Sequence, residues 1–335
     1  MTGDSLSGSV TIHSLNPWQG AEDVTTTFTI FAPDSEVPSG VNGIAGPAER
    51  LVVMSSSQVA MLDELGALNR LVGLSGLQYI TNPTIKSGQA KPADLGYDSN
   101  FNYELLASLN PDAIILYGVD SQSLIENKIR ELGIPFLYFG DYLEDDPVGR
   151  AEWIVAMGYL TGLEDKAIDF HKTLVERYSA EKAQTCGDTK QRQKVLLNAP
   201  YNDSWFIPGP ANYLSRLISD AGGTVLRPEG KSPDDNTSSS VSTEEALLLG
   251  RQADVWINPG SFHSLKEISQ MLPLFSDLSV FNTGRVANFK QSVNSPGNDF
   301  YESGVLHPDL ILRELRAIFL EDSTFTNYRY FNILQ

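Results

Sequence analysis

The chain has 335 residues and a formal charge of −18, from 24 Lys and Arg against 42 Asp and Glu. Hydrophobic residues make up 41% of it and charged residues 20%, which is typical of a folded chain and not of a disordered one. At about 100–200 residues per domain, this length predicts two domains. The net negative charge disfavours non-specific binding to nucleic acid, because such binding needs clustered Lys and Arg. It also disfavours adsorption to anionic lipid.

The single cysteine, Cys186, excludes an internal disulfide, a CxxC redox pair and a zinc ribbon. The longest apolar runs, such as residues 134–139, are too short to cross a bilayer. The first residues, Met-Thr-Gly-Asp-Ser, lack the basic start and the apolar stretch of a signal peptide. We therefore expect either a cytoplasmic protein or an exported one whose leader is not in this sequence.

The first half of the chain predicts an extension followed by an α/β lobe. Residues 1–44 are rich in Ser, Thr, Gly and Pro and contain one β-like run at 25–31, so we expect an N-terminal extension with short strands on the outside of a domain. In residues 45–146, short apolar strands alternate with helices, which indicates a parallel sheet covered on both faces. The strands are predicted at 51–54, 71–74, 113–117 and 134–139, and the helices near 56–65, 103–109 and 124–132.

A long helix is predicted to connect this lobe to a second one. Pro147 after two acidic residues is a good helix start, and Gly162 interrupts the pattern, so residues 147–162 form the connecting helix. Residues 163–335 repeat the α/β rhythm and form the second lobe. There the strands are predicted at 195–198, 255–258 and 286–289, with polar loops near 199–210 and 228–240 and helices near 163–178, 211–221, 243–250, 265–272 and from 308.

The usual catalytic and metal-binding signatures do not occur in the sequence. There is no G-x-S-x-G, no G-x-G-x-x-G after a strand, and Gly230-Lys231-Ser232 has the wrong spacing for a phosphate loop. The paired carboxylates at 144–146 and 234–235 lie in polar stretches, where solvation and helix capping explain them. We predict a protein that is not an enzyme and has no metal site. The four histidines are never at metal-ligand spacing: His13, His171, His263 and His307.

Aromatic and small polar residues follow several of the predicted strands. In open parallel sheets the ligand crevice lies at the carboxyl ends of the strands. An aromatic-lined cleft suits a bulky ligand with flat or apolar faces, although some of these rings are expected to fill the core instead. Trp205 is the strongest candidate, since it lies in a predicted polar loop just before Pro208-Gly-Pro210. The other candidate ligand contacts are Ser57, Tyr79, Tyr117, Tyr142, Phe262, Asn298 and Phe300.

Several segments, in order and spacing, carry a resemblance to a known family. They are residues 49–57, 62–73, 103–112, 133–135, 208–210, 221–223 and 297–309. From about Pro47 to Glu321 the chain resembles the class III periplasmic substrate-binding proteins of ABC importers, which carry iron–siderophore complexes, haem or cobalamin. The resemblance implies two Rossmann-like lobes with parallel sheets, joined by a single long helix, with the ligand cleft between them.

The resemblance also implies partners and a location. One surface glutamate on each lobe would dock onto the permease of a permease–ATPase complex in the inner membrane. By motif these are Glu104 and Glu244, although the adjacent Glu245 is an alternative to the second. The protein would be a monomer in the periplasm or lipid-anchored facing it, would bind no nucleic acid, and would need no cofactor besides the chelate it carries.

The choice of cargo depends on the basic residues. Polyanionic ferric siderophores usually call for several arginines, and the candidates near the loops are few: Arg227, Arg285 and Lys290. This shortage favours cobalamin or another near-neutral bulky chelate. Two other functions stay open at this point: a two-lobed enzyme of similar fold, such as a chelatase or glycosyltransferase, and a stand-alone ligand-sensing module.

Overall fold

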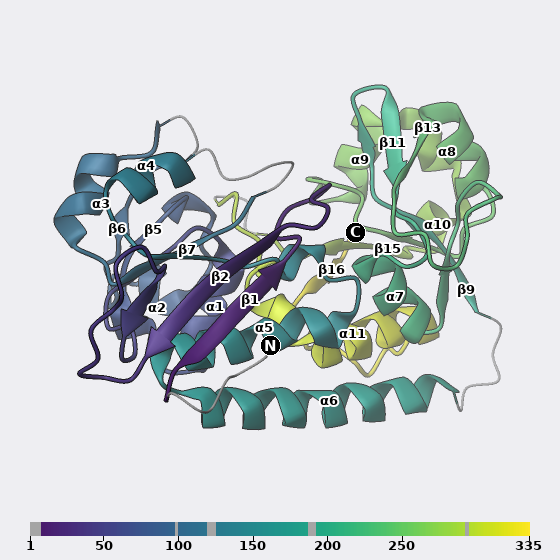
Figure 1. Cartoon of the computed structure of the whole chain (residues 1–335). Coiled ribbons are helices and arrows are strands. Elements are labelled where there is room, and N and C mark those ends of the chain that lie inside the picture. The colour runs from purple at the N-terminus through teal and green to yellow at the C-terminus, as the bar shows by residue number, and fades with distance from the viewer. Residues whose placement is uncertain (1–7, 98–99, 119–124, 187–191, 292–294) are drawn as a thin grey trace. The chain divides into compact units, whose positions relative to one another are not determined.

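The computed structural model describes residues 8–97, 100–118, 125–186, 192–291 and 295–335 (Figure 1). The chain divides into two compact units. Unit 1 comprises Met1–Glu144, Gly149–Thr173 and Ser295–Leu306, and unit 2 comprises Asp145–Val148, Leu174–Asn294 and His307–Gln335. Each unit contains a five-stranded sheet with helices, so the predicted α/β class with parallel sheets is confirmed.

Unit 1 is built on a five-stranded sheet in which every neighbouring pair is parallel. Its order is β6 (Ala93–Asp94), β5 (Leu71–Leu74), β4 (Leu51–Val53), β7 (Ala113–Leu116) and β8 (Phe136–Tyr138). β4, β7 and β8 are buried along their whole length, which explains their uninterrupted apolar sequences. The helices of this part are α1 (Ser56–Glu64), α2 (Pro83–Lys86), α3 (Tyr103–Leu109) and α4 (Glu126–Glu131). Residue 124, where α4 was predicted to begin, lies outside the described residues.

The N-terminal extension forms its own three-stranded sheet from β1 (Val10–Leu15), β2 (Thr25–Phe31) and β3 (Gly43–Ala45). It packs beside β8 of unit 1. The Asn42 side chain donates to the Phe136 carbonyl at 2.7 Å and accepts from the Phe136 N–H at 3.0 Å, and the Ser14 hydroxyl donates to the Tyr138 carbonyl at 2.6 Å. The strand predicted at 25–31 is confirmed as β2. The extension contains two further strands, β1 and β3.

Unit 2 contains a second five-stranded sheet and a small antiparallel one. The larger sheet has the order β12 (Gly223–Val225), β9 (Gln193–Leu197), β14 (Val255–Ile257), β15 (Val286–Phe289) and β16 (Phe331–Ile333), and only β16 is antiparallel to its neighbour. The smaller sheet consists of β10 (Pro200–Tyr201), β11 (Ser204–Ile207) and β13 (Ser239–Ser242). The helices are α7 (Tyr213–Asp220), α8 (Thr243–Gly250), α9 (Leu265–Met271), α10 (Ser279–Asn282) and α11 (Pro308–Leu320).

The small sheet corrects two predictions, because β11 and β13 occupy parts of the stretches expected to be polar loops. The residues of β11 alternate between buried and partly exposed positions, and the strand pairs with β13 over four residues. The sequence of β13 looks like a loop because three of its four residues are serine. Serine can adopt strand geometry but does not provide the apolar pattern that indicates a strand.

Two long helices, α5 (Pro147–Thr161) and α6 (Glu164–Cys186), follow β8. The predicted helix over 147–162 is confirmed as α5, and Gly162 separates the two with a left-handed φ of 65°. The division into units differs from the predicted boundaries. Most of α5 and residues 164–173 of α6 group with unit 1, and so does the segment Ser295–Leu306 near the other end of the chain.

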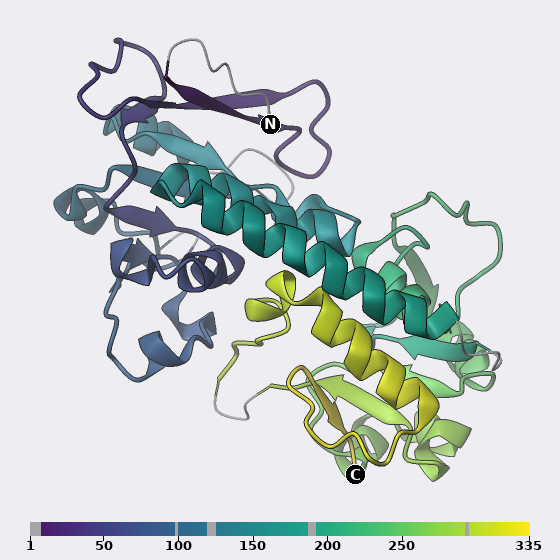
Figure 2. The same cartoon turned by 90° about the horizontal axis from the view of Figure 1, so that it is seen from below.

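The C-terminal half of α6 is held to α11 inside unit 2, where the two helices lie side by side (Figure 2). Arg177 Nε is 3.0 Å from Asp309 Oδ2, and Arg313 Nη2 is 2.6 Å from Glu181 Oε1. Both carboxylates are buried; breaking the Arg177 pair would leave the charge of Asp309 uncompensated in the interior, whereas Glu181 would keep Arg316 at 3.9 Å. None of the described helices combines the length and hydrophobicity needed to span a bilayer.

Candidate functional site

The carboxyl edge of the unit 1 sheet gathers the candidate residues of that unit. Ser57 lies just beyond β4, Tyr117 directly after β7, and Tyr142 soon after β8, in the 3-10 helix Asp141–Leu143. Tyr79 ends another 3-10 helix, Leu77–Tyr79, which follows β5. Since parallel strands end at one edge of a sheet, these positions share that edge, as the sequence predicted.

Tyr117 and Tyr142 form a fixed aromatic pair at this edge. Their ring centroids are 6.2 Å apart in a T-shaped arrangement, and both side chains are half-buried. The Tyr142 hydroxyl donates to the Gly118 carbonyl and accepts from the Gln19 N–H at 3.2 Å. Because Gln19 belongs to the N-terminal extension, that segment helps to position the pair.

A buried carboxylate with an arginine beside it lies at the same edge. Asp141 is 2% exposed, and Arg150 of α5 places Nη2 4.0 Å from its Oδ2. Burial raises the pKa of Asp141, and this outweighs the opposite effects of Arg150 and of a hydrogen bond from Ser57. Ser57 itself is 2% exposed, and its hydroxyl lies 2.9 Å from that of Ser55. The structure therefore gives Ser57 a supporting contact to Asp141 and leaves it little surface for a ligand.

The segment Ser295–Leu306 completes the edge of unit 1. The Thr81 N–H donates to Glu302 Oε2 at 2.6 Å, and the Thr81 hydroxyl lies 3.3 Å from Asp299 Oδ1. Gly297 packs so closely that an added Cβ would lie 2.3 Å from the Tyr79 carbonyl oxygen. Burial raises the pKa of Glu302 to about 7, with the hydrogen bonds from Thr81 opposing the shift. This segment is thus anchored by a buried carboxyl and by close backbone contact.

Two candidates in this segment have local roles. Asn298 is half-buried, and its Oδ1 accepts from the Phe300 N–H at 3.0 Å, which stabilises the turn. Phe300 is 2% exposed and belongs to the core of unit 1, so its predicted position at the ligand surface is wrong. The next ring, Tyr301, is 48% exposed instead.

Exposed tyrosines therefore mark the accessible part of the edge. Tyr79 is 43% exposed and its ring centroid lies 6.0 Å from that of Tyr97, which is 44% exposed. Tyr97 and Tyr301 were not among the predicted contacts. Tyr97 follows the two-residue strand β6, which is too short to show periodicity, and composition alone does not distinguish Tyr301 from Phe300. The term tyrosine cluster is used below for the paired rings of Tyr79 and Tyr97 together with the exposed ring of Tyr301 in the same unit.

The prediction that Trp205 lies in a loop is wrong. It lies in β11 and is fully buried in unit 2, where its ring stacks on Phe275 at 5.1 Å and lies 5.9 Å from Trp256. Its indole N–H donates to the Leu197 carbonyl at 2.8 Å. The side chain has no exposed surface for a ligand, and it stabilises the packing of the small sheet on the larger one.

The carboxyl edge of unit 2 is built from asparagines. Asn258 Nδ2 donates to Asn198 Oδ1 at 2.9 Å, and both residues have left-handed φ angles, of 56° and 70°, where their strands end. Asn288 donates to the carbonyls of Gly260 and Phe262 at 2.6 and 2.7 Å. The side chain of Phe262 is half-buried, and the hydrogen bond from Asn288 goes to its backbone carbonyl. Sequence reasoning missed these asparagines, because single Asn residues after strands are also ordinary turn residues.

The basic candidates of unit 2 differ in position. Arg285 precedes β15 and therefore lies at the opposite edge, 3.3 Å from Glu321. Lys290 follows β15 and donates to the Tyr328 carbonyl at 3.0 Å. Arg227 comes shortly after β12, is half-buried, and donates to the Ser215 hydroxyl at 3.2 Å. Burial lowers the pKa of Arg227 from its ordinary value. Of the three, Arg285 is the one whose strand places it away from the carboxyl edge.

The two glutamates predicted to dock are both exposed in the first turn of a helix. Glu104 is the second residue of α3, which Asn102 caps by accepting from the Leu105 N–H at 2.9 Å. Glu244 is the second residue of α8, which Ser242 caps by accepting from the Glu245 N–H at 3.1 Å. Neither glutamate has a Lys, Arg or His nitrogen within 4.0 Å among the described residues, so both carboxylates are accessible to a partner. The equally exposed Glu245 remains the alternative to Glu244.

The described residues contain no group of three or more His, Cys, Asp or Glu side chains that could hold a metal ion. The chemistry of the unit 1 edge is that of recognition: aromatic faces, hydroxyls and backbone groups, with one arginine beside a buried carboxyl. Such an edge can stack on flat or apolar surfaces and orient them with a few hydrogen bonds.

Comparison with known proteins finds relatives that are similar in sequence and solved structures that are similar in fold. The chain is 26% identical over 311 residues to an uncharacterized lipoprotein of Methanocaldococcus jannaschii, covering 87% of this chain and 72% of the relative. The crystal structure of a periplasmic binding protein from Veillonella parvula matches with a TM-score of 0.65 at 16% identity, covering 93% and 98% of the two chains. The periplasmic vitamin B12 binding protein of Vibrio cholerae matches with a TM-score of 0.60 at 15% identity, covering 82% and 98%.

The family assignment rests on a match to the sequence profile described as "Periplasmic binding protein", which extends over residues 51–291. This range is more than half of the chain. It includes all the strands of both five-stranded sheets except β16. The resemblance noted from the sequence is therefore confirmed, and the two-unit α/β architecture is similar to that of the matched structures. The chain belongs to the periplasmic binding protein family.

Proposed function

We propose that this protein is the substrate-binding component of an ABC importer and delivers a bulky metal chelate to the permease. The observation that carries the proposal is the tyrosine cluster at the carboxyl edge of a parallel sheet, in a chain of this family. Flat macrocycles and chelates with apolar faces stack well on exposed tyrosine rings. Proteins with similar folds that bind vitamin B12 and haem support this class of cargo.

A near-neutral chelate such as cobalamin fits the charges better than a polyanionic siderophore. Arg150 lies beside Asp141 in unit 1, and the edge of unit 2 is built from neutral asparagines. A strongly anionic ligand would need several arginines to replace its hydration. Arg227 and Lys290 provide two basic groups on the carboxyl side of the unit 2 sheet, and Arg285 lies at the opposite edge. The charge distribution therefore supports cobalamin first, and haem or an iron complex of low charge second.

The proposed delivery step uses Glu104 and Glu244 as contacts to basic residues of the permease. Both are exposed, and helix first turns hold carboxylates favourably. Residence in the periplasm, or on its membrane surface through a lipid anchor, follows from the same role and is supported by the lipoprotein relative.

A thermal-shift screen against cobalamins, haem and ferric siderophores tests the cargo. A ligand at a hundredfold excess over its dissociation constant stabilises the folded state by about 2.7 kcal/mol. Tyr79→Ala and Tyr301→Ala are expected to weaken the shift, whereas Leu15→Ala, which removes an even more exposed apolar side chain from β1, is expected to leave it unchanged. No stabilisation by any chelate would contradict the proposal.

Charge reversal tests the docking step separately. The double variant Glu104→Arg with Glu244→Arg is expected to abolish uptake in vesicles containing the permease and its ATPase, while chelate binding stays at the wild-type level. The matched control is Glu176→Arg, an exposed glutamate on α6. Loss of chelate binding in the double variant, or normal uptake by it, would contradict the docking role. Repeating the experiment with Glu245→Arg in place of Glu244→Arg decides between the neighbours.

A further inference from the structure

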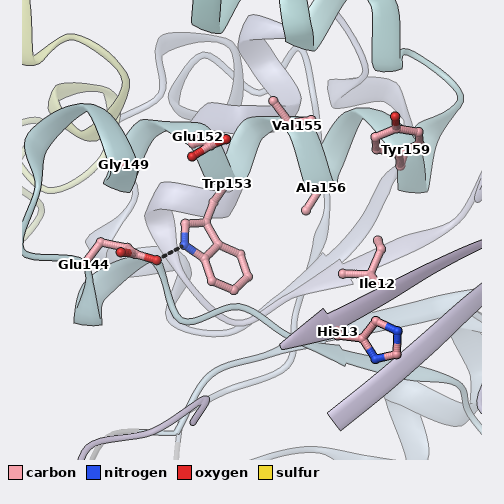
Figure 3. Close-up of a pocket in the computed structure, with 9 residues that line it drawn as sticks. All are labelled: Ile12, His13, Glu144, Gly149, Glu152, Trp153, Val155, Ala156 and Tyr159. Carbon is pink, nitrogen blue, oxygen red and sulfur yellow. Dashed lines mark hydrogen bonds between the residues drawn. The ribbon is translucent and has the colours of Figure 1, made fainter. Parts of the chain in front are cut away.

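A cavity inside unit 1 belongs to neither the tyrosine cluster nor the docking glutamates. It has a volume of about 360 Å³ and lies between strand β1 and helix α5 (Figure 3). One wall comes from the N-terminal extension, which precedes the residues matched by the family profile. It is lined by Ile12, His13, Glu144, Gly149, Glu152, Trp153, Val155, Ala156 and Tyr159.

The cavity has an apolar floor and an aromatic wall. Ile12 and Ala156 are each 2% exposed and form the floor. Trp153 projects from α5, with its ring centroid 5.1 Å from that of Phe139, and its indole N–H donates to Glu144 Oε1 at 3.1 Å (Figure 3). These two contacts fix the indole, so a ligand would meet a ring that is already positioned.

The charged groups of the lining are predominantly acidic. Glu144 and Glu152 both line the cavity, and no Lys, Arg or His nitrogen lies within 4.0 Å of either carboxylate among the described residues. His13 at the β1 side is the one basic side chain of the lining. The carboxylate of Glu144 beside the indole of Trp153, with the exposed carboxylate of Glu152 on the same helix, attracts a cation through charge and through the negative face of the ring.

We propose that this cavity is an accessory binding site for a small organic cation, an amine or quaternary ammonium compound with an apolar body. The volume lies within the range of small-ligand pockets, which is about 300–1,000 Å³. The apolar body packs on the half-buried Val155 and Tyr159, the cationic head lies against Trp153, and Glu144 and Glu152 compensate its charge. None of the residues that line the cavity belongs to the tyrosine cluster.

Calorimetric titration of the full chain with choline and with its neutral isostere 3,3-dimethylbutan-1-ol tests the charge requirement. Choline is expected to bind saturably and at least tenfold more tightly than the isostere, and added salt is expected to weaken it. Equal affinity for the two compounds, or no saturable binding of choline at millimolar concentration, would overturn the proposal.

Variants locate the site. Glu144→Gln and Glu152→Gln are each expected to weaken choline binding several-fold, and Trp153→Phe to weaken it less than Trp153→Ala. Glu36→Gln, at an exposed position of unit 1 outside the cavity, is the matched control, and Tyr79→Ala is expected to leave choline binding unchanged. Thermal unfolding of each variant confirms that it is folded. Wild-type affinity in the folded Glu144→Gln and Glu152→Gln variants would overturn the assignment.

Discussion

The buried carboxyl of Glu302 should make the stability of this protein depend on pH. Glu302 is 2% exposed and accepts the Thr81 N–H at 2.6 Å, which holds the segment Ser295–Leu306 on unit 1. Burial raises its pKa from 4.5 to about 7. The folded state therefore binds this proton more tightly than the unfolded state does, and folding stability falls as pH rises between these two values.

The size of the effect follows from the shift. Each pH unit between the two pKa values changes the free energy of unfolding by about 1.4 kcal/mol, and the full shift corresponds to about 3 kcal/mol. The stabilising contribution is complete below pH 4.5, declines as pH rises, and is lost above pH 7. Between pH 5.5 and 8.0 the expected loss is about 2 kcal/mol, because only the interval up to pH 7 contributes.

Glu302→Gln removes the titrating group and keeps an oxygen that can accept the Thr81 N–H. Urea unfolding at pH 5.5, 7.0 and 8.0 should show the variant gaining about 2 kcal/mol on the wild type across this range. Glu22→Gln, at an exposed position of the N-terminal extension, is the control and should follow the wild type at each pH. A constant difference between Glu302→Gln and the wild type would refute the reasoning, since it would mean that Glu302 titrates equally in both states.

Three further substitutions test the packing described above. Trp205→Ala should destabilise unit 2 by about 3–5 kcal/mol through the cavity it leaves, measured by chemical denaturation, whereas a marginal change would contradict its core position. Glu314→Ala removes the acceptor of the Arg329, Tyr330 and Phe331 N–H groups, so amide hydrogen exchange in β16 should accelerate while β14 stays protected. Gly297→Ala places a Cβ against the Tyr79 carbonyl and should lower both the Tm and chelate affinity; unchanged values would show that the segment shifts freely.

Much of the parallel-sheet framework could be predicted because it is determined by short-range patterns. Buried strands such as β4 and β7 read as continuous apolar runs, and helices such as α3 and α5 begin with recognisable capping or proline signals. The small sheet was missed because β13 consists of serines and a valine and depends on pairing with β11. The segment Ser295–Leu306 was predicted to belong to the second lobe. Its position in the sequence does not reveal that it packs onto unit 1.

The candidate site was harder to predict, because the residue types that follow a strand do not reveal which of their side chains are buried. Trp205 and Phe300 have the residue types expected of ligand contacts, yet both are needed inside the fold, where large rings contribute most to packing. Tyr79 was predicted as a contact and is exposed, while Tyr97 and Tyr301 are found only from the structure. A sequence pattern can place an aromatic residue at the end of a strand, but the rotation of the chain after that strand decides which ring faces solvent.

The position of Tyr301 connects the pH dependence of Glu302 to ligand recognition. Tyr301 belongs to the tyrosine cluster of unit 1, yet it lies near the far end of the chain and is adjacent to the residue that anchors its segment. Because Glu302 lies in the same short segment as Gly297, the desolvation cost of its ionised carboxyl disfavours the packed position of this segment against Tyr79 and Thr81, although the hydrogen bonds from Thr81 favour the ionised form. The position of Tyr301 therefore depends on a neighbouring carboxyl group that is protonated in acid, so this edge of unit 1 is expected to be held most firmly below pH 4.5 and progressively less firmly as the pH rises to 7.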